Sequence, residues 1–326
     1  MKVIITFISI AFLYSCGGQV DKTRVGEYFG EFAPKDSAKI FAVDEVSIQY
    51  NVRDFAVSPD GAEIFYSLRG PSGATIISLK RIDNIWSNPE VAPFSGEYFD
   101  LEPSFSPDGN KLYFVSQRPL EKGGYEKDFD IWYTEKNGTM WGEPVNLGEP
   151  VNTEANEFYP SFTSDGTLYF TAAYKESIGG EDIFFSKFQD GKFLQPENVG
   201  SSVNTEADEY NSFVSSDGSF LMFTSHGWGK GFGSGDLWVS FKDDNNEFQK
   251  PVNMGEFVNT PFFEFCPSLS PDGRYMFFTS NRRSEELKNK ASTYNDIIAE
   301  LQSPLNGSQN IYWIDAGFIK HLNEVE

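Results

Sequence analysis

PSFSPDG, at residues 103–109, decides the fold, because it returns in recognisable form along the whole chain. Ser-Pro-Asp-Gly is turn chemistry: proline fixes φ, aspartate bonds to its own backbone, and glycine accepts a positive φ. The other copies are 55–61 (FAVSPDG), 160–166 (PSFTSDG), 211–218 (NSFVSSDG) and 267–273 (PSLSPDG). A phrase that recurs about every 50 residues indicates a repeat architecture.

Each turn is followed by an almost wholly apolar stretch, such as KLYFVS at 111–116 and YMFFTS at 275–280. Every repeat therefore opens with a hairpin whose second strand is buried on both faces. The glycines of the turns are expected at positive φ. They are Gly61, Gly109, Gly166, Gly218 and Gly273.

Two further phrases complete the repeat. One is an aspartate followed by an apolar strand, as in DIWYT at 130–134, and the other is an aromatic residue shortly before a proline, as in Trp141 to Pro144. A short apolar strand follows, and in three repeats Val-Asn-Thr comes after it, as at 151–153. Four short strands in about 50 residues are the content of one propeller blade.

The sequence thus predicts an all-β fold, a single β-propeller of five four-stranded blades. The last repeat lacks an obvious fourth strand after residue 314, whereas 40–48 (IFAVDEVSI) resembles one. Because a propeller must close to hide its strand edges, residues 40–46 are expected to pair beside 310–315. Six blades are the alternative, if residues 24–50 and the insertion 284–308 build another.

The turn phrases, the Asp-Ile-aromatic phrases and residues 310–316 (NIYWIDA) resemble the TolB-type, WD-repeat-like propeller repeats of bacterial envelope proteins. The resemblance covers roughly residues 27–326. It implies a propeller that binds a ligand or a protein, but the family also includes sugar-active enzymes, so the fold alone does not decide the function.

The N-terminus predicts export and lipidation. Lys2 precedes an apolar run at 3–13, too short to span a bilayer, as in a signal peptide. Residues 13–17 (LYSCG) resemble a lipobox in which Tyr14 departs from the usual small residue; this implies cleavage after residue 15 and a thioether lipid on Cys16. Residues 16–26 would then be a tether, and the protein an outer-membrane lipoprotein facing the periplasm or the cell surface. The alternative is an ordinary signal peptide cut nearby, with Cys16 a free thiol.

Composition excludes several kinds of partner and site. A net charge of −22 repels nucleic acid and anionic lipid, so any membrane attachment should be through the anchor only. Only two histidines are present, and no G-x-S-x-G motif, so we expect no metal site, no cofactor and no Ser-His-acid triad. Cys266 lies in an apolar run and is expected to be buried. The stretch 227–235 (GWGKGFGSG) is interpreted as a loop between strands, or as a loop whose bare backbone touches a ligand.

Alignment of the repeats selects one set of candidate site residues. An acid lies three residues before each opening phrase, with Arg53 taken as its counterpart in the first repeat, and a second set lies just past the second strand. A hairpin brings its open ends together, so both sets should share the face opposite the turns. They would form either ion pairs and caps between blades or a polar ring at the channel mouth, with Tyr174 and His226, which break the arginine pattern, marking a ligand. The candidates are Asp100, Glu157, Asp208 and Glu264 in the first set, and Arg69, Arg118, Tyr174, His226 and Arg282 in the second.

The leading functional hypothesis is a monomeric, membrane-anchored propeller that binds an unknown protein or glycan without catalysis. The alternative is a carbohydrate-active enzyme, a glycan hydrolase or lyase, that uses carboxylates at the channel mouth. A passive structural partner in an envelope complex is the third possibility.

Overall fold

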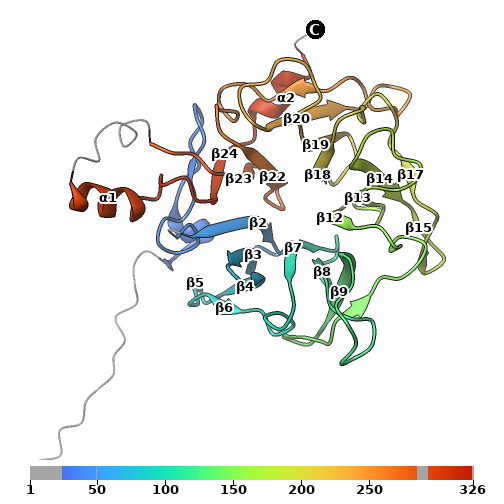
Figure 1. The fold of residues 1–326 in the computed structure, drawn as a ribbon, viewed down its shortest axis with the longest axis horizontal. Coiled ribbons are helices and arrows are strands. Elements are labelled where there is room, and N and C mark those ends of the chain that lie inside the picture. The colour runs from blue at the N-terminus through green and yellow to red at the C-terminus, as the bar shows by residue number, and fades with distance from the viewer. Residues whose placement is uncertain (1–23, 49, 285–292, 325–326) are drawn as a thin grey trace, which may run out of the picture.

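Five antiparallel sheets surround a central axis in the computed structural model, which describes residues 24–48, 50–284 and 293–324 (Figure 1). The predicted signal peptide, Cys16 and most of the predicted tether lie outside the described residues. None of the helices in the described ranges is long and apolar enough to cross a membrane.

Each blade begins with its innermost strand and proceeds outward. Blade one holds β2 (Asn51–Val57), β3 (Glu63–Gly70), β4 (Gly73–Ile82), β5 (Ile85–Trp86) and β6 (Glu90–Val91), and blade two holds β7 (Asp100–Phe105), β8 (Lys111–Ser116), β9 (Asp130–Asn137), β10 (Met140–Trp141) and β11 (Val145–Asn146). Blade three holds β12 (Glu157–Phe162), β13 (Leu168–Ala172), β14 (Asp182–Ser186) and β17 (Glu197–Asn198), with the outer hairpin β15 (Phe188–Gln189) and β16 (Lys192–Phe193). Blade four holds β18 (Glu209–Val214), β19 (Phe220–Ser225), β20 (Asp236–Phe241) and β21 (Val252–Asn253), and blade five holds β22 (Glu264–Leu269), β23 (Tyr275–Ser280), β24 (Asn310–Asp315) and β1 (Lys39–Ile40).

The prediction of five blades is confirmed, and the six-blade alternative is wrong. The insertion 284–308 contributes the helix α1 (Tyr294–Leu301), which lies outside the ring at the left of Figure 1. Among the described residues before β2, the regular elements are the 3-10 turn η2 (Glu27–Gly30) and β1. A short helix, α2 (Phe318–Leu322), follows the last strand.

The turn phrases fold as their chemistry predicts. In blade one the Ser58 hydroxyl donates to Asp60 Oδ1 (2.5 Å), which also accepts from the Ala62 amide (3.0 Å). The amide of Gly61 donates to the Ser58 carbonyl (2.7 Å), which needs a left-handed glycine. All five turn glycines have positive φ, between 67° and 85°, so this prediction is confirmed.

The ring is closed by a strand from the N-terminal segment, as predicted. Lys39 and Ile40 pair with Trp313 and Tyr312 of β24, and the Phe41 amide donates to the Ile311 carbonyl (2.8 Å). Ser47 then bonds through its hydroxyl to both the amide and the carbonyl of Ile311 (3.2 Å each). The paired strand is thus shorter than 40–46 and begins one residue earlier.

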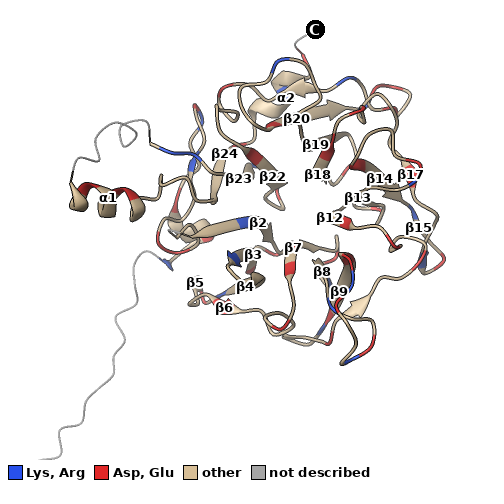
Figure 2. Ribbon diagram, in the orientation of Figure 1, with Lys and Arg blue, Asp and Glu red and all other residues tan. Residues whose placement is uncertain are grey.

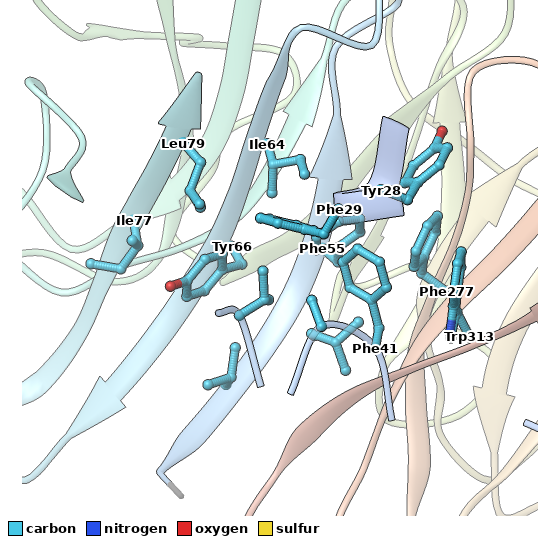
Figure 3. Close-up of a cluster of buried hydrophobic side chains, with 14 of the residues drawn as sticks. Tyr28, Phe29, Phe41, Phe55, Ile64, Tyr66, Ile77, Leu79, Phe277 and Trp313 are labelled. Atoms are coloured by element: carbon cyan, nitrogen blue, oxygen red, sulfur yellow. The ribbon is translucent and has the colours of Figure 1, made fainter. Parts of the chain in front are cut away.

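The closing segment also supplies core. Phe41 is fully buried, with its ring 4.9 Å from Trp313 and 5.1 Å from Phe55. Tyr28 and Phe29 of η2 pack beside it, so that blades one and five share an aromatic core with residues that precede both (Figure 3).

Candidate functional site

Three of the four predicted acids, Asp100, Glu157 and Glu264, begin the innermost strands and contribute to contacts between neighbouring blades. Asp100, the first residue of β7, accepts the Ser116 hydroxyl (2.6 Å) and the Arg118 guanidinium (2.7 Å). Arg118 also donates to the carbonyl of Phe94, in the segment that leaves blade one (3.0 Å). We call this arrangement of acid, donor and preceding carbonyl the brace.

The brace recurs with different donors. In blade five, Glu264 pairs with Arg282 (3.2 Å), which donates to the Val258 carbonyl (2.6 Å). In blade three the Tyr174 hydroxyl donates to the carbonyl of Val151. The donor in blade four is an indole, because Trp228 Nε1 bonds to the carbonyl of Val203 (2.9 Å). Ion pairs and caps between blades, the first interpretation, therefore describe the geometry of Asp100, Glu157, Glu264, Arg118, Tyr174 and Arg282.

Within the part of the chain that the structure describes, the acids of blades three and four have no arginine partner and accept hydroxyl hydrogen bonds instead. Burial raises the pKa of Glu157 to about 8, and burial also raises the pKa of Glu209. Each accepts a threonine hydroxyl, from Thr153 (2.8 Å) and Thr205 (2.9 Å). Below about pH 8 the Glu157 carboxyl is therefore neutral, which suits a neutral tyrosine donor. Tyr174 thus takes part in the contact with the preceding blade, and its role as the marker of a ligand stays a prediction.

Asp208 does not occupy the brace. Glu209 pairs with Ser225 in β19 just as Asp100 pairs with Ser116 in β8, so the alignment was one residue early in the fourth repeat. His226 is displaced in the same way. Arg118 lies two residues after Ser116, and the residue two positions after Ser225 is Gly227. Because successive strand residues point to opposite faces, a shift of one residue changes what a side chain meets.

The first repeat was also misaligned. Val52 pairs with Leu68, so these two apolar residues replace the acid and the serine of the brace, and Gly70 replaces the arginine. Arg53 and Arg69, which the alignment placed with the brace residues, therefore do not belong to a brace. Both line the central cavity described below.

The glycine-rich stretch 227–235 packs against the next blade. The Ser234 amide donates to the Phe262 carbonyl (3.2 Å), and the Glu264 amide donates to the Gly235 carbonyl (3.0 Å). A Cβ on Gly233 would lie 2.2 Å from the Thr260 carbonyl oxygen. The glycines thus permit a close approach between two backbones, as the first interpretation of this loop holds.

One residue at positive φ interrupts the innermost strand of every blade. The pairing register shifts at this point in all five sheets, as in a β-bulge. Non-glycine residues rarely adopt positive φ, so a fivefold recurrence means that the fold requires it. We call these residues the hub ring: Asp54 (61°), Glu102 (59°), Tyr159 (51°), Asn211 (50°) and Cys266 (54°).

The hub ring is buried and joined by one cation, Arg53. Its Nε donates to Asp54 Oδ1 (2.7 Å), and its Nη2 lies 2.9 Å from Glu102 Oε1 and 3.3 Å from Cys266 Sγ. The Cys266 thiol donates to Asp54 Oδ1 (2.8 Å). Cys266 is buried as predicted, but it serves as a hydrogen-bond donor, and burial raises the pKa of its thiol, which keeps it from being a nucleophile.

The Glu102 side chain accepts three hydrogen bonds within the hub. Its Oε1 accepts from Asn211 Nδ2 (3.3 Å) as well as from Arg53, and its Oε2 accepts from the Tyr159 amide (2.7 Å). Burial raises the pKa of Glu102 to about 8, against the opposing effect of Arg53. Figure 2 shows acidic segments of β7, β12 and β22 and a basic segment of β2 gathered around the centre.

A cavity of about 340 Å³, which we call the mouth pocket, opens over the hub ring. The residue before each hub residue lines it, one from every blade. These are Arg53, Leu101, Phe158, Tyr210 and Phe265. Its other polar lining residues are Arg69, Glu102, Glu181, Asn211 and Gln309.

The wall formed by blades four and five is aromatic. The Tyr210 hydroxyl lies 2.9 Å from His226 Nε2, and the His226 ring stacks on Phe263 with centroids 6.1 Å apart. Phe263 stacks in turn on Phe265 (4.6 Å), and the Arg53 guanidinium lies over Phe265 (5.0 Å). His226 does not itself line the mouth pocket, but it contacts Tyr210 and Phe263, which do.

A second cavity, of about 230 Å³, lies on the turn side of the hub and is lined mainly by prolines and aromatics of the turn phrases. Glu102 and Tyr159 line it too, so the hub ring separates two openings. Within the three described ranges, no group of three or more His, Cys, Asp or Glu residues could hold a metal ion.

No family model and no curated protein sequence matches this chain. Among solved structures, a putative TolB from Agrobacterium tumefaciens is 16% identical with a TM-score of 0.46, over 75% of this chain and 72% of that one. TolB from Acinetobacter baumannii is 17% identical with a TM-score of 0.46, over 72% of this chain and half of its own length. An alpha-L-arabinofuranosidase from Lactobacillus brevis is 12% identical with a TM-score of 0.46, over 82% and 91%. At such identities the likeness is one of fold only.

Proposed function

We propose that this protein is a non-catalytic binding propeller, which takes up a glycan or protein ligand at the mouth pocket. It would act as a monomer outside the cytoplasm, held to the outer membrane by a lipid on Cys16. The hub ring is the single observation that carries the binding function.

The hub positions are equivalent in geometry yet different in chemistry. A bulge at positive φ is met most readily by Gly, Asn or Asp, so a purely structural hub would repeat one of them. This hub instead contains an acid pair, a phenol, an amide and a thiol around Arg53. Burying such a cluster costs desolvation energy, and we attribute its retention to ligand recognition.

Catalysis is the second candidate, favoured by two carboxyl groups that line the same cavity. Burial raises the pKa of both Glu102 and Glu181, as a general acid requires. Both oxygens of Glu102, however, accept hydrogen bonds from Arg53, Asn211 and Tyr159, which favours a positioning role over proton transfer. Release of reducing sugar by the full chain, and its loss in Glu181→Gln, would establish the enzyme instead.

Binding is tested with glycan and peptide arrays probed by the full chain and by Tyr210→Ala. Tyr210 lines the mouth pocket, whereas Tyr125, the control, is 96% exposed and does not line it. We expect Tyr210→Ala to lose binding that Tyr125→Ala retains, with both variants melting within a few degrees of the parent. Equal binding by both variants would place the site elsewhere.

The anchor is tested separately with Cys16→Ser. The variant should move from the membrane to the soluble fraction of cells. Membrane association that survives the substitution would contradict lipidation at this residue.

A further inference from the structure

A third cavity adjoins the mouth pocket. It has a volume of about 570 Å³ and lies over the seam between blades one and five. Arg69 and Gln309 line both cavities, so these two side chains stand where the inner space meets the outer one. The two cavities therefore adjoin at Arg69 and Gln309, between the hub and the edge of blade one; we call the pair of cavities the groove.

Arg69 is the one charged residue among those that line the outer cavity. Its side chain is exposed and, among the described residues, forms neither an ion pair nor a hydrogen bond, unlike Arg53, Arg118 and Arg282. In a chain of net charge −22, an uncommitted guanidinium in a hollow favours an anionic group. A carboxylate matches its planar fork through two parallel hydrogen bonds.

Gln309 is fixed on the seam by its backbone. Its amide donates to Asn51 Oδ1 (3.1 Å), and its carbonyl accepts from the Val52 amide (2.8 Å). Its side-chain Oε1 accepts no hydrogen bond from the described residues. Tyr50, 65% exposed, lines the outer cavity, and Tyr210 lines the inner one. Amide groups beside aromatic rings suit the hydroxyl groups and apolar faces of sugar rings.

We infer that the ligand is a linear acidic oligosaccharide, with neutral sugar surface in the mouth pocket and a uronic-acid carboxylate on Arg69. This inference rests on the proposed function and narrows it. A single monosaccharide would occupy only one of the two cavities, so a chain of several residues is required to reach both. A peptide with a free carboxylate is the competing class, and the experiment must distinguish it.

The test is calorimetric titration of the full chain with galacturonic-acid oligomers of one to six residues and with their methyl esters. The esters keep the sugar chain and replace each carboxylate by an uncharged methyl ester. We expect affinity to rise with chain length, and the acid to bind about 10-fold or more tightly than its ester, as one charge-assisted contact allows. Arg69→Gln should abolish that preference, so that acid and ester bind the variant with equal affinity. Arg274→Gln, an exposed arginine that lines neither cavity, is the control and should keep the preference.

Several results would overturn the inference. They are equal affinity for acid and ester, a preference that survives Arg69→Gln, affinity independent of chain length, or no binding of any uronate oligomer. Peptides that bind with Arg69 dependence while uronates do not would assign the groove to the competing class. The proposed function is tested independently of these results, because it depends on whether Tyr210→Ala loses the ligands found by array.

Discussion

Phe41→Ala should destabilise the propeller more than any change at the surface of the same segment. Phe41 is fully buried and its ring lies within 6.4 Å of five other rings, from Tyr28, Phe29, Phe55, Phe277 and Trp313. Truncation of a buried phenylalanine costs roughly 3–5 kcal/mol, and lost aromatic pairs favour the upper half, so we expect about 4 kcal/mol. With a urea m-value of about 3 kcal/mol/M, the unfolding midpoint should fall by about 1.3 M.

Urea titration followed by tryptophan fluorescence measures this directly, because Trp313 is 4.9 Å from the substituted ring. Phe32→Ala is the matched control: Phe32 belongs to the same segment, is 90% exposed, and should shift stability by less than about 0.5 kcal/mol. If both variants unfold at the parent's midpoint, the N-terminal segment does not close the ring, and the account of blade five is wrong.

Three other perturbations separate strain, protonation and charge. Gly273→Val should cost roughly 1–3 kcal/mol from backbone strain alone, because φ is 68° and its Cβ would meet no atom within 4 Å; unchanged urea stability would refute this. Burial raises the pKa of Glu157 to about 8, so the fold holds a proton that the unfolded chain releases near about pH 4.3. Its stabilising effect is complete below that value and declines as the pH rises to about 8, so Glu157→Gln should flatten this decline in melting temperature; parallel curves for parent and variant would contradict it. Arg53→Leu should cost roughly 3–5 kcal/mol by leaving the buried Asp54 carboxylate without its cation, and adding Asp54→Asn should recover part of the loss; a double variant no more stable than the single one would argue against the hub's charge balance.

The repeat and its blade count could be predicted from the sequence because turn chemistry and strand hydrophobicity are local properties. The prediction of acids at the start of the innermost strands was right in position for Asp100, Glu157 and Glu264. It was one residue early at Asp208, because the fourth phrase was taken from Asn211 whereas the structure aligns Ser212 with Pro103. In a strand, a counting error of one residue exchanges one face for the other.

The hub ring was missed because its members share no chemistry. Four of them stand directly before the opening phrase and Asn211 is the first residue of the fourth phrase, and an acid pair, a tyrosine, an asparagine and a cysteine do not form a recognisable column. One sequence signal could have found the hub ring. Its position has the same place in every repeat but a different residue type each time, whereas the neighbouring strands repeat closely. The contacts of Arg53 with Glu102 and Cys266 could not be foreseen, because they join blades far apart in the sequence.

The closing contact has a consequence for how the chain acquires its shape during synthesis. Ser47 bonds to Ile311, which lies 264 positions later, and β1 pairs with the same late strand. A ribosome releases the early segment long before its partner exists, so Tyr28, Phe29 and Phe41 must wait without their aromatic neighbours from blade five. Blades one to four can form in order as they emerge, but the circle remains open until translation passes β24. This interval exposes apolar rings, and a chaperone would have its best opportunity to bind the chain then.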